Sequence, residues 1–186
     1  MATTEKEILD AAVRMFSRYG VKRTSMADLA QEAGISRQTL YNAYKNKDDV
    51  LRALIRSYTE DALSAIESGL ANAQDLGDQL DIVFDRMVFD GFDLVRDMPN
   101  AQDIIDGFNA AGQEELNASA EKFRLVIERI LSPRQEALAR AGLTPSELSD
   151  FVQRSAKAAS SAARDRDHLT RLLKSLKHLC LAASGE

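Results

Sequence analysis

The fold is decided by residues 25–47, which read SMADLAQEAGISRQTLYNAYKNK. This stretch opens with Ser25 and Asp28, a capping-box spacing in which each side chain accepts a hydrogen bond from the other residue's backbone and so starts a helix. Gly34 can take the left-handed backbone conformation that ends a helix. Ser36 is a preferred N-cap residue for a second helix. Two short helices joined by a tight turn predict a helix-turn-helix unit.

The apolar residues in and before this stretch indicate a small three-helix core. Ala30 and Ala33 are small enough for the two short helices to cross closely. A preceding amphipathic helix begins at a capping box, Thr4 to Glu7, and ends at Gly20. We expect the following side chains to point into the shared core: Val13, Phe16, Leu29, Ile35, Leu40 and Tyr44.

The second short helix carries polar side chains on its outward face. These are the types that recognise base edges in the major groove, since Arg pairs with guanine, Gln or Asn pairs with adenine, and Thr contacts the thymine methyl group. We expect Arg37 and Gln38 to read bases, with Thr39 and Asn42 beside them. The donors expected to contact phosphate and fix the register on DNA are Lys22, Arg23, Ser25, Tyr41, Lys45 and Lys47. For any single residue the alternative is an ordinary solvated side chain, but the cluster favours double-stranded DNA as a partner.

The longer stretch TSMADLAQEAGISRQTLYNAYKNKDDVL, residues 24–51, resembles the signature of the TetR family of repressors, and the similarity extends over about residues 5–55. The resemblance implies a helical homodimer with an N-terminal DNA-binding unit and a C-terminal domain for ligand binding and dimerisation. It also implies that Tyr41 and Lys47 contact phosphate. Ala43 departs from the family's pattern, in which a His or Tyr is common, and so lacks the side chain for one backbone contact.

The rest of the chain has the composition of an all-helical protein. Of its 186 residues, 45% are hydrophobic and only 6% aromatic, and no sustained alternation rich in Val, Ile and Thr predicts a strand. We therefore expect an all-α fold of about nine helices. Residues 1–48 are the expected helix-turn-helix domain, and residues 49–186 the helical effector-binding and dimerisation domain. After a long fourth helix that follows Asn46, the expected helices span residues 76–98, 100–109, 113–131, 133–141, 145–164 and 167–183.

Charge is segregated along the chain, although its net value of −5 is unusual for a DNA-binding protein. Residues 1–50 hold eight Lys or Arg against seven Asp or Glu, whereas residues 60–115 hold two against fourteen. Phosphate contacts need only a local basic face within a Debye length of the DNA backbone. The acidic remainder is therefore compatible with DNA binding.

The sequence gives no support for catalysis or metal binding. The two histidines, His168 and His178, are ten residues apart, which is not the one-turn spacing of a helical metal pair, and they are expected at a surface or interface. The sequence has no Gly-rich phosphate loop and no CxxC motif. We expect neither an enzyme nor a cofactor.

The expected location is the cytoplasm. The N-terminus is polar and there is no run of about 18 apolar residues, so we expect neither a signal peptide nor a membrane-spanning helix. The single cysteine, Cys180, excludes an intrachain disulfide and fits a reducing compartment. We expect it to pack as a small apolar residue.

The middle of the chain is where an effector pocket is expected. A mostly apolar cavity between helices would suit a small hydrophobic effector. The candidate lining residues are Phe84, Met87, Val88, Phe92, Ile105, Phe108, Phe123 and Ile127. The alternative for each is packing in a solid core. The helical spacing of Asp78, Asp81 and Asp85 predicts a solvated face, whereas an inward-pointing residue among Asp90, Asp93 and Asp97 would favour a cationic effector.

The last two helices are the expected dimer interface. Each carries an apolar stripe, and small residues on the first of them let a partner helix approach closely. The candidates are Phe151, Val152, Ala156, Ala159, Ala163, Leu169, Leu172, Leu173, Leu176 and Cys180. The alternative is that both helices pack inside one subunit. The resemblance favours a four-helix interface between two subunits.

Together these features predict a repressor that binds a palindromic operator as a homodimer and is released by a small-molecule effector. A two-fold dimer would place its recognition helices about one DNA turn apart. The fourth helix is the expected lever, since it begins at Lys47 and runs into the apolar body. The alternative is a DNA-binding regulator without a small-molecule effector, controlled by a protein partner.

Overall fold

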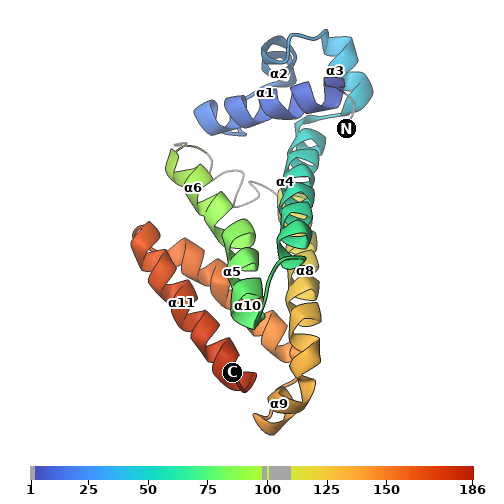
Figure 1. Cartoon of the computed structure of the whole chain (residues 1–186). Helices are drawn as coiled ribbons and strands as arrows, with labels where there is room; N and C mark the ends of the chain where they lie inside the picture. The colour runs from blue at the N-terminus through green and yellow to red at the C-terminus, as the bar shows by residue number, and fades with distance from the viewer. Residues whose placement is uncertain (1–2, 98–99, 101–109) are drawn as a thin grey trace. The chain divides into compact units, whose positions relative to one another are not determined.

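The computed structural model describes residues 3–97, 100 and 110–186, and all regular secondary structure in these residues is helical (Figure 1). This confirms the expected all-α fold. The chain forms two compact units, Met1–Glu60 with Asp93–Ser119, called unit 1, and Asp61–Phe92 with Ala120–Glu186, called unit 2. The helix expected over residues 100–109 lies outside the described residues, except for Asn100.

Unit 1 contains three complete helices and parts of three others. The complete helices are α1 (Thr3–Tyr19), α2 (Met26–Glu32) and α3 (Arg37–Ala43). They are joined by the first part of α4 (Lys47–Leu70), the end of α6 (Asp90–Asp97) and the start of α8 (Ala110–Leu131). Figure 1 shows α1, α2 and α3 gathered at the N-terminal end of α4.

The core of unit 1 confirms the expected inward-facing residues. Phe16, Leu29 and Leu40 are fully buried, and Tyr44 is nearly so. Val13 and Ile35 are partly buried and pack against them. The first turns of α4 complete this core with Val50, Leu51, Leu54 and Ile55. The helix-turn-helix therefore packs against α1 and the first turns of α4 through one shared core.

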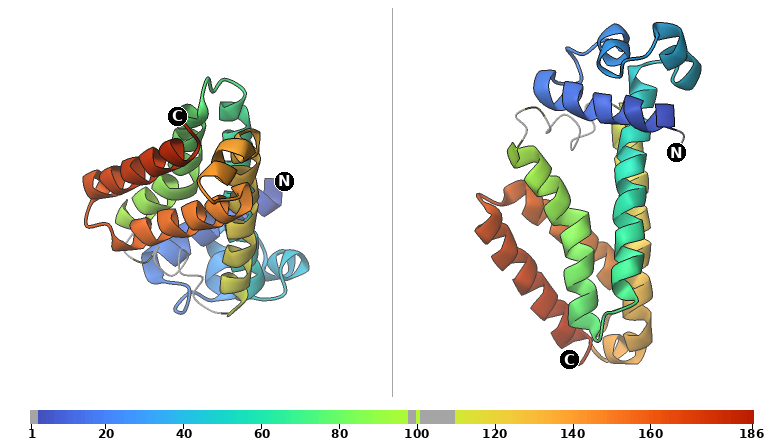
Figure 2. Two further views of the ribbon diagram at one scale, coloured as in Figure 1. Left: turned by 90° about the horizontal axis from the view of Figure 1, so that it is seen from below. Right: turned by 45° about the horizontal axis from the view of Figure 1, so that its top comes forward.

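Unit 2 contains the remaining helices. These are the rest of α4 and α8, the start of α6, α5 (Leu76–Phe84), η1 (Asp85–Phe89), η2 (Ser132–Arg134), α9 (Gln135–Arg140), α10 (Pro145–Ala162) and α11 (Arg166–Ala183). A three-residue connection joins α10 to α11, and the two helices run antiparallel side by side, with α5 beside α11 (Figure 2). Their apolar faces meet in one core that also takes up Ile127, Leu131 and Leu138.

The prediction of a continuous helix over residues 76–98 was wrong in one respect, because a π-helical turn, η1, interrupts that helix. The backbone N–H of Asp90 donates to the carbonyl of Asp85, five residues back. One row of buried side chains recurs here every four residues, at Leu76, Leu80, Phe84 and Val88, with Val83 buried beside it. Four exceeds the 3.6 residues of an α-helical turn, so the buried face would drift around a regular helix. A π turn holds more residues per turn and offsets that drift.

Two further features of the structure bear on the expectations from sequence. Within residues 3–97 and 110–186, no helix has both the length and the apolar composition that a bilayer-crossing segment needs. Cys180 is buried in the core of unit 2, and burial raises the pKa of its thiol to about 11. It packs as a small apolar residue, as expected.

Candidate nucleic-acid interface

The first helix of the helix-turn-helix, α2, starts at the predicted capping box. The Ser25 backbone N–H donates to Asp28 Oδ2 at 2.9 Å, and the Asp28 backbone N–H donates to Ser25 Oγ at 3.2 Å. The Ser25 hydroxyl donates to the same carboxylate at 2.7 Å. This hydroxyl bond is the main cause that lowers the pKa of Asp28, followed by the backbone bond, and the charge of Arg37 adds to the effect. The Ser25 hydroxyl, predicted to contact phosphate, is thus engaged within its own helix cap.

The turn between α2 and α3 depends on the backbone conformation of Gly34. Its φ angle is 68°, in the left-handed region. Its N–H donates to the Gln31 carbonyl at 3.1 Å, and the N–H of Ile35 donates to the Ala30 carbonyl at 3.0 Å. These two bonds form a Schellman motif, which ends α2 and turns the chain toward α3. A Cβ atom at Gly34 would meet nothing within 4 Å, so the φ angle and not a lack of space favours glycine here.

The second helix, α3, is anchored on one face and exposed on the other. Ser36 Oγ caps it by accepting the Thr39 N–H at 3.0 Å. Leu40 is fully buried, and the Tyr44 hydroxyl donates to Glu5 Oε1 of α1 at 3.2 Å. The exposed face carries five of the predicted DNA-contacting residues, Arg37, Gln38, Thr39, Tyr41 and Asn42. The structure therefore brings together the predicted base readers and the tyrosine expected at phosphate.

Two of these exposed side chains bond to each other. Gln38 Nε2 donates to Asn42 Oδ1 at 2.9 Å, across one turn of α3. Thr39 Oγ1 lies 2.8 Å from Ser36 Oγ, so its hydroxyl is also held by a neighbour. The polar face of α3 is thus partly ordered before any partner binds.

Lys47 is placed differently from an ordinary exposed phosphate-binding lysine. Its Nζ donates to the Thr24 carbonyl at 2.8 Å and to the Lys22 carbonyl at 3.2 Å. Thr24 is itself buried, and its hydroxyl donates to the Gly20 carbonyl at 2.9 Å. The first residue of α4 thereby fixes the segment between α1 and α2. The exposed side chains of Lys22 and Arg23 project from that segment.

Asn100 forms hydrogen bonds with α1 that the sequence does not predict. Its backbone N–H donates to the Ser17 carbonyl at 3.1 Å, and its side-chain Nδ2 donates to the Arg18 carbonyl at 2.8 Å. Both carbonyls belong to the last turn of α1, where helix carbonyls have no partner inside the helix. The pair Pro99 and Asn100 signals a turn in the sequence, but no local pattern identifies α1 as its target.

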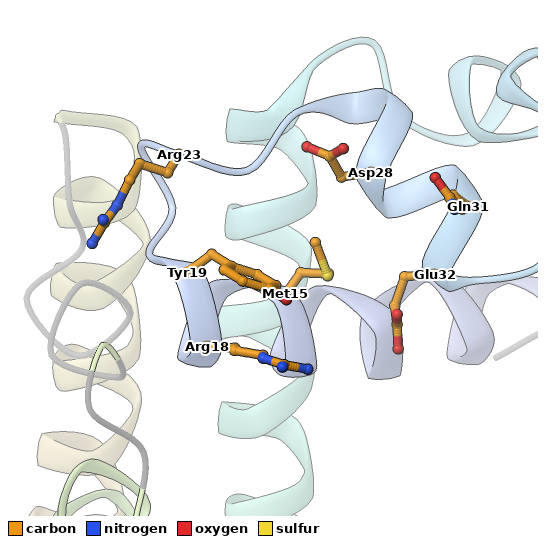
Figure 3. A pocket seen from close by; sticks show the side chains of 7 residues that line it. All are labelled: Met15, Arg18, Tyr19, Arg23, Asp28, Gln31 and Glu32. Carbon is orange, nitrogen blue, oxygen red and sulfur yellow. The ribbon is translucent and has the colours of Figure 1, made fainter.

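A hollow of about 620 Å³ lies on the α1 and α2 side of unit 1. Figure 3 shows the side chains that line it. The side chains of Met15 and Tyr19 lie at its centre, with Arg23 at one end and Gln31 and Glu32 at the other. Arg18 and Asp28 complete the lining. Because these residues come from α1, α2 and the segment between them, the hollow is separate from the exposed face of α3.

The residues predicted for an effector pocket lie in or against the core of unit 2 where the structure describes them. Phe84, Val88 and Ile127 are buried, and Met87, Phe92 and Phe123 pack against them. Ile105 and Phe108 lie outside the described residues. A hollow of about 610 Å³ between α5, η1 and α11 includes Phe84 in its lining, together with Phe89, Lys174 and other residues.

The acidic residues of the middle region are mostly solvated where they are described. Asp78, Asp81 and Asp85 are exposed, as their helical spacing predicted, and Asp90 is exposed as well. Asp81 forms an ion pair of 2.5 Å with Lys177 of α11. Asp93 is half-buried. The side chain of Asp97 lies outside the described part of the chain.

The ten residues predicted for a dimer interface divide into three groups by burial. Six are buried within the single chain, where they join α10 and α11 to the core of unit 2: Val152, Ala156, Leu169, Leu173, Leu176 and Cys180. Ala159, Ala163 and Leu172 are half-buried. Phe151 of α10 is 55% exposed, and Leu179 of α11, on the same helical face as Leu172, is 64% exposed.

Comparison with known proteins shows which family and which solved structures this chain is similar to. The model of the family described as bacterial regulatory proteins, tetR family, matches residues 8–54. The HTH-type transcriptional regulator TtgR of Pseudomonas putida is 36% identical over 78 residues, which are 42% of this chain and 35% of that protein. The matched part of the chain thus covers about a third of the length of this curated relative.

Two solved structures share the fold over almost the whole chain. SmeT, the repressor of the Stenotrophomonas maltophilia multidrug efflux pump SmeDEF, has a TM-score of 0.70 and 22% identity and covers 98% of this chain and 90% of its own. A transcriptional regulator of the TetR/AcrR family from Thermobifida fusca has a TM-score of 0.66 and 17% identity and covers 95% and 96%. The resemblance seen in the sequence is therefore confirmed: residues 8–54 match the tetR family of bacterial regulatory proteins, and the chain shares the fold of these solved structures.

Proposed function

We propose that this chain is a transcriptional regulator that binds double-stranded DNA with α3 in the major groove. The observation that carries this proposal is the exposed face of α3, where Arg37, Gln38 and Asn42 project from a helix that is capped and anchored in a core. Because the cap and the core already hold the helix backbone, only the side chains have to be ordered when they meet base edges. The match of residues 8–54 to the tetR family supports the same reading.

Phosphate contacts would come from both ends of the helix-turn-helix. The exposed side chains of Lys22, Arg23, Tyr41 and Lys45 are suited to this role. Lys47 uses two of its three N–H groups on the backbone carbonyls of Lys22 and Thr24, which leaves one for a phosphate. The proposed DNA-binding domain is residues 1–48, and the proposed effector-binding and dimerisation domain is residues 49–186.

The proposed assembly is a homodimer through α10 and α11. Phe151, Ala158 and Ala162 lie on one exposed face of α10, and Leu172 and Leu179 lie on one face of α11. Large apolar side chains that remain exposed in a monomer, next to small ones, are suited to close helix packing against a second copy. This face replaces the buried members of the predicted stripe as the proposed contact surface. A two-fold dimer would present two α3 helices to a palindromic operator.

We further propose that the regulator is a repressor that a small hydrophobic effector releases from DNA. SmeT is described as a repressor and has been solved in complex with triclosan, which supports such a ligand class by analogy. The apolar residues of unit 2 would supply its site. α4 runs without a break from Lys47 in unit 1 to Leu70 in unit 2, so it can carry a change in unit 2 to the segment between α1 and α2 that Lys47 holds.

One observation favours a second candidate, a DNA-binding regulator controlled by a protein partner. Val88 and Ile127, predicted to line an effector pocket, are buried in the core of unit 2 and line neither of the two hollows described above. Side chains that fill the core themselves leave less room there for a ligand. Thermal unfolding with a panel of hydrophobic compounds distinguishes the two candidates, since a ligand that binds the folded state raises the melting temperature.

DNA binding is tested by selecting duplexes from a random library with the purified chain. We expect a palindromic consensus, and Arg37→Ala and Gln38→Ala variants that lose preference at particular bases of each half-site while still binding DNA non-specifically. Arg140→Ala is the matched control, because Arg140 is an exposed arginine of α9 in unit 2. If both α3 variants select the same consensus as the wild type, α3 is not the reading element.

A further inference from the structure

We propose that Asn42 is a positioning residue that holds the Gln38 amide ready to read the adenine of an A·T pair in each half-site. This inference rests on the proposed DNA-binding function and deepens it by naming a base. It starts from the hydrogen bond of 2.9 Å between Gln38 Nε2 and Asn42 Oδ1 on the exposed face of α3. Sequence spacing places the two side chains on neighbouring turns, where such amide pairs form.

The bond fixes which groups Gln38 can offer to DNA. A glutamine amide has two N–H donors and one carbonyl oxygen acceptor. One N–H is used by Asn42. We infer that this is the N–H trans to Oε1, so that the N–H on the same side as Oε1 stays available. Gln38 therefore presents one donor and one acceptor side by side. Asn42 keeps both of its own N–H groups, so holding Gln38 does not prevent it from contacting a phosphate.

This donor and acceptor pair matches adenine better than any other base. In the major groove adenine offers N7 as an acceptor and its N6 amino group as a donor, which is the complement of the Gln38 amide. Guanine offers two acceptors, N7 and O6, and would leave Gln38 Oε1 facing an acceptor. Arg37, which has only donors, suits guanine instead. The two adjacent residues of α3 are thus equipped for different bases.

The rest of α3 makes this arrangement stiff. Ser36 caps the helix directly before Arg37, and Leu40, between Gln38 and Asn42 in sequence, is fully buried. The backbone that carries the pair therefore cannot rotate without disturbing the core of unit 1. A free glutamine side chain loses rotamer freedom when it binds, and the bond to Asn42 reduces that loss.

The inference is tested with the full chain by competition binding to duplexes that carry each of the four bases at every half-site position. We expect the wild type to prefer adenine at one position of each half-site, by roughly 5- to 100-fold, the range of a bidentate base contact. Gln38→Ala should abolish that preference and leave the preferences at other positions. Asn42→Ala should lower the same preference roughly 3- to 10-fold, because Gln38 is then free to rotate. Loss of a phosphate contact by Asn42 would weaken binding to all duplexes alike and so cancels in this ratio.

Asn42→Asp is the matched variant, because it keeps an oxygen acceptor for Gln38 Nε2. We expect it to retain the adenine preference, even though its added negative charge lowers affinity for all duplexes. Lys45→Ala should weaken binding to all duplexes alike. If Asn42→Ala leaves the adenine preference at the wild-type value, or if the position lost in Gln38→Ala prefers another base, the inference is wrong while the DNA-binding function stands. If the wild type shows no base preference at all, the proposed function itself is wrong.

Discussion

At the scale of single residues, the structure gives Lys47 a structural role beside the phosphate contact proposed for it. Its match to a phosphate-contacting lysine predicted a contact with DNA, but its Nζ also holds the carbonyls of Lys22 and Thr24. These partners lie more than twenty residues away in sequence, and a backbone carbonyl has no residue-specific signal. The type of residue could therefore be predicted, whereas its bonds within the protein could not.

We expect Lys47→Ala to weaken DNA binding more than the loss of one phosphate contact does. Each lost contact reduces the slope of log Kobs against log salt concentration by about one unit. Lys47→Ala should reduce it by about two units, because the segment that carries Lys22 and Arg23 also loses its anchor. Lys45→Ala is the control, with an expected reduction of about one unit. Equal reductions in the two variants would show that the bonds to the carbonyls do not matter for binding.

The raised pKa of Tyr44 predicts that the stability of the fold depends on pH in the alkaline range. Burial, followed by the charge of Glu5 and the hydrogen bond to it, raises the pKa of Tyr44 from 10.0 to about 12. The folded state thus holds this proton more tightly than the unfolded chain. The stabilisation is complete below pH 10 and is lost as the pH rises through 12. Two pKa units correspond to on the order of 3 kcal/mol.

The measurement is the free energy of unfolding in urea between pH 9 and 12. The wild type should lose stability over this range faster than Tyr44→Phe, which has no proton to release. Other groups also titrate here, but they are common to both proteins and cancel in the difference. Parallel curves for the two proteins would contradict the prediction.

At the scale of elements, the starts of α2 and α3 were the most predictable features, because their signals are local. The predicted start of α1 was less accurate, since the helix begins at Thr3 and so includes the expected cap residue Thr4. Ser25 with Asp28 and Ser36 cap α2 and α3 as expected. The π turn that begins at Asp85 was not predictable, since the same residues fit a continuous amphipathic helix. Only the packing of Phe84 and Val88 against the core of unit 2 decides between the two.

The turn between α2 and α3 gives a prediction with a control inside the same chain. Gly34 and Gly142 have φ angles of 68° and 76°, and a Cβ atom would meet nothing within 4 Å at either. Replacing either by alanine should therefore cost only the backbone strain of the left-handed region, about 1–2 kcal/mol in the free energy of unfolding.

DNA binding separates these two substitutions. Gly34→Ala should also reduce operator affinity, because relief of the strain shifts α3 relative to α2. Gly142→Ala, in the turn before α10 of unit 2, should leave the affinity of the folded protein unchanged. Gly34→Asn should recover part of the stability, since asparagine tolerates this conformation better than alanine. A Gly34→Ala variant as unstable as Gly142→Ala but with full affinity would show that the angle of the turn is not critical.

At the scale of the whole molecule, the sequence predicted which helices carry apolar stripes but not which side of each stripe faces the chain's own core. Val152, Leu169 and Leu176 looked as suitable for a dimer as Phe151 did, because periodicity does not distinguish burial inside one chain from burial between two. The fold resolves this by burying the first three and leaving Phe151 and Leu179 exposed. Asn100 shows the same limit, since its partner α1 is more than eighty residues away in sequence.

The proposed homodimer should therefore depend on the exposed residues. We expect the double variant Phe151→Glu with Leu179→Glu to sediment as a monomer, because four carboxylates would face one another across a two-fold apolar contact. The chain itself should remain folded, since neither side chain belongs to the core. Lys157→Glu is the control, a charge change at an exposed position of α10 on a different face from Phe151.

The monomeric variant also tests whether dimerisation serves DNA binding. A single α3 would contact one half-site, so affinity for a palindromic duplex should fall by at least about a hundredfold, while affinity for an isolated half-site should stay near the wild-type value. Val152→Ala gives the opposite pattern, a loss of about 1 kcal/mol or more in stability from a cavity in the core, with the dimer retained. If the Phe151→Glu with Leu179→Glu variant still forms a dimer of full palindrome affinity, the two subunits contact each other through another surface.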